Sequence, residues 1–468
     1  MTPLLEIEDL AVYAGDTGLL EPISLTLSRG ERLTILGETG AGKSLLIQAI
    51  MGLLPSALRC SGRILIDGQD TASMGRKALQ RLWGKRISML PQEPWHSLDP
   101  LMRAGQQVAE VHRCVLHQGP GAAGEQTRLA LAGVGLEQAE NKLPGQLSGG
   151  MAQRLAFCAA TAAGADLVLA DEPTKGLDAS RRDYIARLLR QKSEAGAVLT
   201  ITHDVEVARQ IGGRIMVMRA GQLVEQGSAE AVLDAPRGNY TRELIGAAPT
   251  NWPSQPPCSG APGKPVLEGH RLAKTRGGKC LFENLDVSVG RGEILGITGD
   301  SGCGKSSLGD ILLGLLQPDQ GQVRRAPGVA RHRYLKLYQD PPAAFAPRVR
   351  LARLFDDLIG LHKLDRHRLP PLLEQLRLRP ALLERSAEEV SGGELQRLSI
   401  ARALLLDPVF LFADEPVSRL DPITAREVVM LLADVARRHD CAVLLVSHNP
   451  DLVAKTCDRN IRLSPSPG

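Results

Sequence analysis

The sequence predicts an α/β protein built from two related domains, and three observations support this prediction. A glycine-rich loop ending in Lys-Ser occurs twice, at 37–44 and at 299–306. Residues 10–37 align with residues 272–299 without a gap, at the same offset of 262 residues (37 to 299). A duplication of this size indicates two homologous domains. The length of 468 residues agrees, because one hydrophobic core rarely serves so long a chain.

Each glycine-rich loop lies between an apolar run typical of a buried strand and a run typical of a helix. The flanking runs are 33–36 and 45–54 in the first copy, and 294–297 and 308–316 in the second. This order of strand, loop and helix is what a P-loop requires. The backbone N–H groups and the helix N-terminus favour a phosphate, while the lysine and serine supply an ammonium group and a magnesium ligand. The nucleotide-binding residues predicted in the two loops are Gly37, Glu38, Thr39, Gly40, Ala41, Gly42, Lys43, Ser44, Gly299, Asp300, Ser301, Gly302, Cys303, Gly304, Lys305 and Ser306.

Composition argues against several other classes of protein. Lys and Arg number 56 against 52 Asp and Glu, and aromatic residues make up only 3%, so neither a basic nucleic-acid surface nor a base-stacking role is expected. The eight cysteines include no C-x-x-C pair, which is typical of a reducing compartment, and we interpret Cys303 as a small spacer without chemistry. The N-terminus does not resemble a signal peptide and no apolar run approaches 18 residues, so a soluble cytoplasmic protein is expected.

Two further groups in the first half are placed to contact a triphosphate. Gln92 follows the apolar run 87–90, and at a strand end it could reach the magnesium ion and the γ-phosphate; the alternative is a solvated loop amide. Ser148 can cap the next helix, while Gly149 and Gly150 leave the backbone N–H groups of that helix exposed. These three residues predict a second anion site, although a plain helix cap would look the same.

Acidic residues and a histidine complete the candidate nucleotide-site residues of the first half. The buried run 167–170 ends in Asp171, suited to the hydration shell of magnesium, and in Glu172, suited to polarising an attacking water. Asp178 ends the loop that follows, and His203 follows the next strand, where it could bond a γ-phosphate. Tyr13 could stack on adenine or could be a half-buried strand tyrosine, and its spacing leaves both open.

The second half carries the same residue types in the same order. The spacing from the capping serine to the glutamate is 24 residues in both halves (148 to 172 and 391 to 415), which chance does not explain. From loop lysine to glutamine the second half is shorter, 34 residues (305 to 339) against 49 (43 to 92). The second set consists of Gln339, Ser391, Gly392, Gly393, Asp414, Glu415, Asp421 and His448.

A tether rich in proline separates the two domains. Residues 249–265 contain six prolines and two glycines, which is typical of a linker without fixed structure. The predicted domains are therefore 1–248 and a shortened copy at 266–468. Such a tether raises the local concentration of the two domains to about millimolar.

These motifs, in this order and twice over, resemble the ATP-binding cassette (ABC) ATPases across both halves. The resemblance implies two tandem P-loop NTPase domains, each with a RecA-like α/β core, an antiparallel β subdomain and a helical signature subdomain. It also implies ATP and Mg²⁺ as cofactors. The two cassettes would pair head to tail within one chain, so that each ATP lies between the P-loop of one and the Ser-Gly-Gly signature of the other. Catalytic roles would fall to Glu172, His203, Glu415 and His448, and metal binding to Ser44, Gln92, Asp171, Ser306, Gln339 and Asp414.

Within that family, two segments look like the importers of di- and oligopeptides, nickel and metal chelates. They are residues 92–100 and 236–244. This likeness implies two transmembrane permease subunits and an extracytoplasmic solute-binding protein as partners, no nucleic acid, and a peripheral place on the cytoplasmic face of the inner membrane. Some peptide importers carry a cysteine-bound iron–sulfur cluster, but the corresponding region offers only Cys258, so none is expected.

Several positions depart from the family pattern. Met151 and Glu394 replace the glutamine that usually ends the signature, Lys175-Gly176 replaces Ser-Ala, and Thr275 stands where Tyr13 does. We expect two unequal but competent sites, because both catalytic glutamates are present.

Three other functions are alternatives to an importer. A soluble tandem cassette acting on ribosomes is disfavoured by the proline-rich tether and near-neutral charge, and an exporter by the segment after Gln92. The sequence leaves open a component of a phosphonate-degrading complex. It also does not distinguish nickel from peptide.

Overall fold

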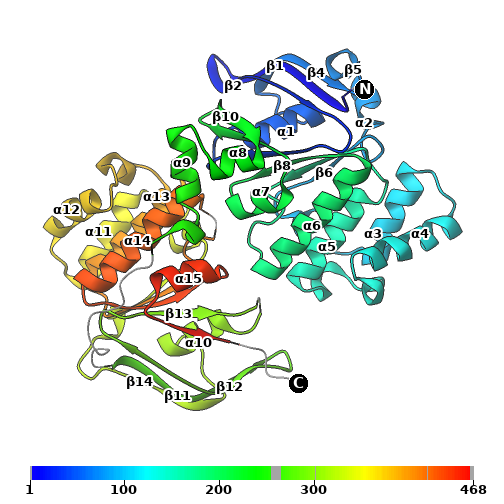
Figure 1. Ribbon diagram of the computed structural model, residues 1–468. Coiled ribbons are helices and arrows are strands. Elements are labelled where there is room, and N and C mark those ends of the chain that lie inside the picture. The colour runs from blue at the N-terminus through cyan, green and yellow to red at the C-terminus, as the bar shows by residue number, and fades with distance from the viewer. Residues whose placement is uncertain (1–2, 254–264, 301, 419, 464–468) are drawn as a thin grey trace. The chain divides into compact units, whose positions relative to one another are not determined.

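The computed structural model describes residues 3–253, 265–300, 302–418 and 420–463 (Figure 1). These residues form two compact units, and the chain passes from one to the other between Ile245 and Gly246. Each unit has a largely parallel sheet, a separate antiparallel sheet and a group of helices. The predicted α/β class with two P-loop units is therefore confirmed.

The main sheet of the first unit has six strands in the order β10-β9-β3-β8-β7-β6. All neighbouring strands in it pair in parallel except β10, which runs antiparallel to β9. The central strands β7 and β8 are buried along their whole length, as in a parallel sheet with helices on both faces. The strands are β3 (Arg32–Leu36), β6 (Ile87–Leu90), β7 (Leu167–Asp171), β8 (Ala197–Thr202), β9 (Arg214–Arg219) and β10 (Gln222–Ser228).

An antiparallel sheet of order β2-β1-β4-β5 accompanies it, made of β1 (Leu5–Ala14), β2 (Thr17–Leu27), β4 (Leu58–Ile66) and β5 (Gln69–Asp70). Helices α3, α4 and α5 contact one another and form the helical part of this unit (Figure 1). The helices are α1 (Lys43–Met51), α2 (Arg76–Gln80), α3 (Ala104–Glu110), α4 (Pro120–Gly133), α5 (Gly149–Thr161), α6 (Ala179–Ala195), α7 (Val205–Ile211), α8 (Ala229–Asp234) and α9 (Asn239–Gly246).

The second unit repeats this architecture with fewer strands. Its parallel sheet has the order β15-β16-β17-β13-β18, and its antiparallel sheet the order β12-β11-β14. The strands are β11 (Pro265–Arg276), β12 (Lys279–Gly290), β13 (Ile294–Thr298), β14 (Gln320–Arg325), β15 (Tyr334–Leu337), β16 (Phe410–Asp414), β17 (Ala442–Val446) and β18 (Arg459–Arg462). The helices are α10 (Lys305–Leu313), α11 (Leu351–His362), α12 (Leu369–Gln375), α13 (Gly392–Leu405), α14 (Pro422–Arg438) and α15 (Pro450–Thr456).

Residues 246–253 pack with the second unit. Pro249–Asn251 form a 3₁₀ turn, and Trp252 is only 2% exposed in the core that also contains Leu452 and Val453 of α15. The indole N–H of Trp252 donates a hydrogen bond of 2.8 Å to the carbonyl of Ala247. Composition alone assigned residues 249–253 to the tether, but burial of the indole fixes them to the second core.

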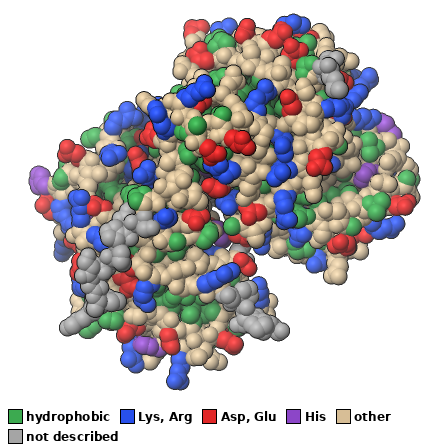
Figure 2. All heavy atoms as spheres, viewed as in Figure 1, with side chains coloured by type: hydrophobic (Ala, Val, Ile, Leu, Met, Phe, Trp, Pro, Cys, Tyr) green, Lys and Arg blue, Asp and Glu red, His purple; other side chains and the backbone are tan. Residues whose placement is uncertain are grey.

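Figure 2 shows Lys and Arg side chains interspersed with Asp and Glu over the visible face of each unit, as the balanced composition implies. Among the described residues, no helix is both long and apolar enough to cross a bilayer.

Candidate functional site

In both P-loops the lysine side chain is held by hydrogen bonds to backbone carbonyl groups of the loop. The Lys43 ammonium donates to the carbonyl oxygens of Gly37 and Glu38 at 2.7 and 2.8 Å. In the second unit, the Lys305 ammonium donates to the carbonyls of Gly299 and Asp300 at 2.7 and 3.0 Å. The same arrangement is thus built twice from the repeated sequence.

Glycine is required at two points of the first loop. Gly42 has a φ of 87° directly before α1, a left-handed conformation that side chains disfavour. A Cβ on Gly37 would overlap the carbonyl oxygen of Met218 on β9. The loop can therefore lie against the sheet with its backbone N–H groups turned toward a phosphate.

A pocket of about 250 Å³ collects most of the residues predicted in the first half. It brings the P-loop together with Gln92, Glu172 and His203. Tyr13 does not line it; the Arg59 guanidinium lies 4.9 Å from its ring centre instead. The lining residues are Leu19, Thr39, Gly40, Ala41, Gly42, Lys43, Ser44, Leu45, Gln92, Glu172, Lys175 and His203.

The aspartates at the ends of β7 and β16 have the chemistry of magnesium ligands. Burial raises the pKa of Asp171, an effect that the Ser44 side chain opposes, and its Oδ1 has no partner among the described residues. The Ser306 hydroxyl donates to Asp414 Oδ1 at 3.0 Å, and burial likewise raises the pKa of Asp414. A serine hydroxyl beside a buried carboxylate is the oxygen donor set that Mg²⁺ prefers, so the residues fit the ion.

Each catalytic glutamate predicted from the sequence pairs with the predicted histidine. Glu172 Oε2 lies 2.8 Å from His203 Nδ1, and Glu415 Oε1 lies 2.5 Å from His448 Nε2. Burial favours the neutral form of Glu172, but the charge of His203 outweighs it and lowers the pKa of the carboxyl. The same pairing raises the pKa of His203 against the effect of burial. Each pair can hold a carboxylate in a fixed orientation.

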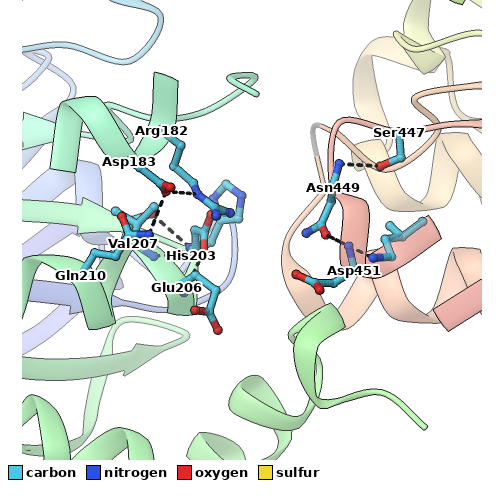
Figure 3. A network of polar contacts seen from close by, with 12 residues as sticks. Arg182, Asp183, His203, Glu206, Val207, Gln210, Ser447, Asn449 and Asp451 are labelled. Carbon is cyan, nitrogen blue, oxygen red and sulfur yellow. Dashed lines mark hydrogen bonds and ion pairs between the residues drawn. The ribbon is translucent and has the colours of Figure 1, made fainter. Parts of the chain in front are cut away.

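Capped turns follow the two histidines, and Figure 3 labels His203 in the first unit and Ser447 and Asn449, on either side of position 448, in the second. Asp204 follows His203 and caps α7 by accepting from the N–H groups of Glu206 and Val207 at 2.8 and 3.2 Å. In the second unit, Asn449 follows His448 and caps α15, while its own N–H donates to the Ser447 hydroxyl at 3.1 Å.

The network around α7 extends to α6, where the Gln210 amide donates to Asp183 Oδ1 at 2.8 Å (Figure 3). The Arg182 guanidinium lies 3.5 Å from Asp204 Oδ2. These contacts fasten the histidine turn to the neighbouring helix.

The glutamines following β6 and β15 differ in their contacts. Gln92 lines the first pocket, whereas the Gln339 amide donates to Glu415 Oε2 at 2.8 Å. Gln339 also lies 3.5 Å from the Ser418 hydroxyl. In the second unit the predicted magnesium-reaching glutamine is thus joined to the predicted base.

The two Ser-Gly-Gly segments begin α5 and α13, but their charges differ. Ser148 caps α5 by accepting from the N–H of Met151. A Cβ on Gly150 would approach the Arg181 guanidinium to 2.6 Å, so a cation lies over this helix start. Arg181 also lines a pocket of about 210 Å³ beside the segment.

In the second unit the hydroxyl of Ser391 donates to Glu394 Oε2 at 2.7 Å, so a carboxylate occupies the start of α13. Thr424 takes the place of the arginine, since a Cβ on Gly393 would meet its methyl group. Gly149 and Gly392 are the first residues of the two helices.

The predicted loop aspartates are helix caps in both units. Asp178 accepts from the N–H of Arg181 at 3.1 Å and begins α6. Asp421 accepts from the N–H of Thr424 at 3.0 Å and begins α14. The two caps therefore hold Arg181 and Thr424, the residues that lie against the starts of α5 and α13.

Sequence reasoning missed a contact made by Tyr240. Its hydroxyl accepts from the N–H of Glu38 in the P-loop at 3.1 Å. In the sequence this tyrosine is one residue of the segment 236–244, and nothing local indicates that it reaches a loop 202 residues away. Lys175 was noticed as a departure from the family pattern, but not as a residue of the pocket.

Cys303 is buried, and burial raises the pKa of its thiol. Ser301 and Cys258 lie outside the described residues. Within the described parts of the chain, no group of three or more His, Cys, Asp or Glu could hold a metal ion.

Comparison with known proteins gives a consistent family match. The family model described as ABC transporter matches residues 20–175 and 282–418. The chain is 34% identical to a protein of Agrobacterium fabrum named peptidoglycan transport ATP-binding protein YejF, over 96% of this chain and 88% of that one. It is 32% identical to the glutathione import ATP-binding protein GsiA of Salmonella typhi, over 93% of this chain and 80% of that one.

Among solved structures, CbiO1 from Clostridium perfringens, part of the ABC transporter complex CbiONQ, matches with a TM-score of 0.46 and 29% identity. The match covers 50% of this chain and 92% of that one.

Proposed function

Because this chain belongs to the ABC transporter family, as an ATPase and the ATP-binding subunit of an importer, we propose that it drives uptake of a peptide-type solute. The observation that carries this proposal is the presence of two complete residue sets, one in each unit. Each set contains a P-loop lysine, a histidine–glutamate pair and a buried aspartate. A chain with both sets can supply two nucleotide sites by itself.

The residues of each unit divide the work on ATP. Lys43 and Lys305 bind phosphate oxygens once they leave the loop carbonyls that they now contact. Glu172 and Glu415 accept a proton from the attacking water, and His203 and His448 orient these carboxylates. Mg²⁺, when bound through Ser44 and Asp171 or Ser306 and Asp414, neutralises charge on the phosphates.

We propose that the two ATP sites are shared between the cassettes. The first would combine the P-loop set of Lys43 with Ser391, Gly392 and Gly393, and the second that of Lys305 with Ser148, Gly149 and Gly150. The backbone N–H groups at the start of a helix favour a phosphate. ATP would hold the cassettes together, and hydrolysis would release them.

The solute is proposed to be a peptide or a peptide-like molecule rather than nickel. Residues 92–100 and 236–244 support the peptide and nickel importers as one group. Within that group, relatives at 34% and 32% identity are named for peptidoglycan and glutathione transport, which favours a peptide-type solute. We propose that selectivity for the solute resides in the partners. We place the chain on the cytoplasmic face of the membrane, with two permease subunits and an extracytoplasmic solute-binding protein.

Affinity purification of the tagged chain from detergent-solubilised native membranes, followed by mass spectrometry, tests this function. Two polytopic membrane proteins in equal amounts are expected, and the tag fused to an unrelated protein is the control. Recovery of ribosomes or a soluble enzyme complex without any membrane subunit would refute the importer and leave the ATPase assignment intact.

A further inference from the structure

Four aligned positions that differ between the two cassettes lie close together in the second unit, around the side chain of Lys336. These positions are on the P-loop helices and on the two strands beside them, whose residues pair in the same register in both units. The first cassette has Ile47, Gln48, Met89 and Leu169 where the second has Gly309, Asp310, Lys336 and Phe412. We call the second set the lysine cluster.

Lys336 is held between two aspartates inside the second unit. Its side chain is only 13% exposed, and its ammonium lies 2.7 Å from Asp310 Oδ1 and 3.5 Å from Asp414 Oδ2. The same ammonium lies 5.1 and 5.5 Å from the ring centres of Phe412 and Tyr338. Two carboxylates and two aromatic faces therefore surround the ammonium group in a partly buried place, and their attraction offsets the cost of its burial.

The surroundings of the lysine are shaped to receive it. A Cβ on Gly309 of α10 would overlap the ring of Phe412, so the aromatic ring fits only because position 309 has no side chain. In the first cassette Ile47 and Leu169 are both buried and fill the corresponding space, and Met89 packs against the same core. Charge and volume therefore change together between the cassettes.

The consequence falls on Asp414, which corresponds to Asp171. Both carboxylate oxygens of Asp414 are engaged, Oδ1 by the Ser306 hydroxyl and Oδ2 by the ammonium of Lys336. By contrast, Asp171 Oδ1 is buried without a partner in the described structure. The first cassette has an additional lysine, Lys175, but it lines the nucleotide pocket from the loop after β7.

We propose that the ammonium group of Lys336 competes with Mg²⁺ for Asp414 in the second nucleotide site. This competition weakens the binding of magnesium–nucleotide there, and Asp310 is the alternative partner of the lysine. The proposal rests on the assignment of Asp414 to the magnesium ion in the proposed function. Asp310 draws the ammonium away from Asp414, so the lysine can move between its two partners when a divalent ion arrives. The first cassette has Met89 and Gln48 at the aligned positions, and the cations that act on Asp171 there are Lys43 and Lys175, both of which belong to the nucleotide pocket.

The test measures binding of a divalent ion rather than turnover. Mn²⁺, in place of Mg²⁺, would be titrated into the full chain in the presence of ADP, and bound ion would be measured by electron paramagnetic resonance. The chain would carry Lys43→Ala, which weakens nucleotide binding at the first site, so that the signal comes from the second site. The double variant Asp310→Gln/Lys336→Met installs the pair of the first cassette. We expect it to bind Mn²⁺ about tenfold more tightly, equivalent to about 1.4 kcal/mol.

A second variant separates this role from a structural one. Asp310→Gln alone leaves Lys336 with only Asp414, so Mn²⁺ affinity should fall below that of the Lys43→Ala parent. Loss of packing would not shift the two variants in opposite directions. Equal Mn²⁺ affinity in all three proteins would overturn the inference alone, whereas a lack of Mn²⁺ binding in all of them would overturn the site assignment as well.

Discussion

Gly309 provides a quantitative test of the packing in the second cassette. The residue lies in the middle of α10, and a Cβ placed there would overlap the ring of Phe412. Replacing Gly309 with alanine therefore sets two effects against each other. Helix propensity favours alanine over glycine by about 1 kcal/mol in a helix interior. Overpacking of a tight core costs about 1 to 3 kcal/mol.

The second effect should prevail, because the overlap is with a fully buried ring that has no free space to enter. We expect Gly309→Ala to lower the free energy of unfolding of the second unit by up to about 2 kcal/mol, after the helix gain is subtracted. Adding Phe412→Leu, the residue of the first cassette, removes the overlap. The two substitutions should therefore couple by about 1 to 3 kcal/mol.

Urea unfolding followed by the fluorescence of Trp252 measures these free energies. The chain has three tryptophans, and replacing Trp83 and Trp95 with phenylalanine leaves the one that is buried in the second unit. An increase in stability by the full helix-propensity gain in Gly309→Ala would refute the reasoning, because it would mean that the ring of Phe412 does not fill this space.

Further predictions concern the catalytic groups and the P-loop. Glu172→Gln and Glu415→Gln should each reduce but not abolish steady-state ATP hydrolysis, since we expect two competent sites; full turnover in Glu172→Gln with none in Glu415→Gln would exclude a competent first site. Without nucleotide or magnesium, His203→Gln should lower the free energy of unfolding most below pH 6.5, the ordinary histidine pKa, and the difference should shrink as the pH rises through the raised pKa of His203. The difference in free energy of unfolding between the parent and His203→Gln should also shrink at low pH, as Glu172 protonates through its lowered pKa. A difference that does not depend on pH would contradict the ion pair. Tyr240→Phe should destabilise the first unit by about 0.5 to 1.5 kcal/mol in urea unfolding, because the Glu38 N–H loses its acceptor.

The sequence predicted the parts of each site that depend on local order. A strand followed by a glycine-rich turn and a helix fixes the place of Lys43, and a buried strand ending in two carboxylates fixes Asp171 and Glu172. Because parallel strands end at the same edge of a sheet, these groups converge once the sheet forms. The duplication made each assignment stronger, since Lys305 and Asp414 repeat the pattern.

Contacts made through tertiary packing were beyond sequence reasoning. Tyr240 reaches Glu38 across 202 residues, and no periodicity announces such an approach. Lys336 occupies an otherwise apolar strand, where a charged residue usually suggests an exposed face, and only the folded structure places two aspartates around it. For Tyr13 the spacing in the sequence allowed stacking on adenine, but it is equally compatible with the contact to Arg59 that the structure shows.

The packing of Trp252 decides how the two cassettes can be separated for study. A fragment that begins at residue 266, where composition suggests that the second cassette starts, would lack the indole that covers Leu452 and Val453 of α15. Losing a large buried aromatic side chain typically costs about 3 to 5 kcal/mol, comparable with the total stability of many domains. A recombinant second cassette should therefore begin at Gly246, and poor solubility of a shorter one would reflect this missing anchor rather than dependence on the first cassette.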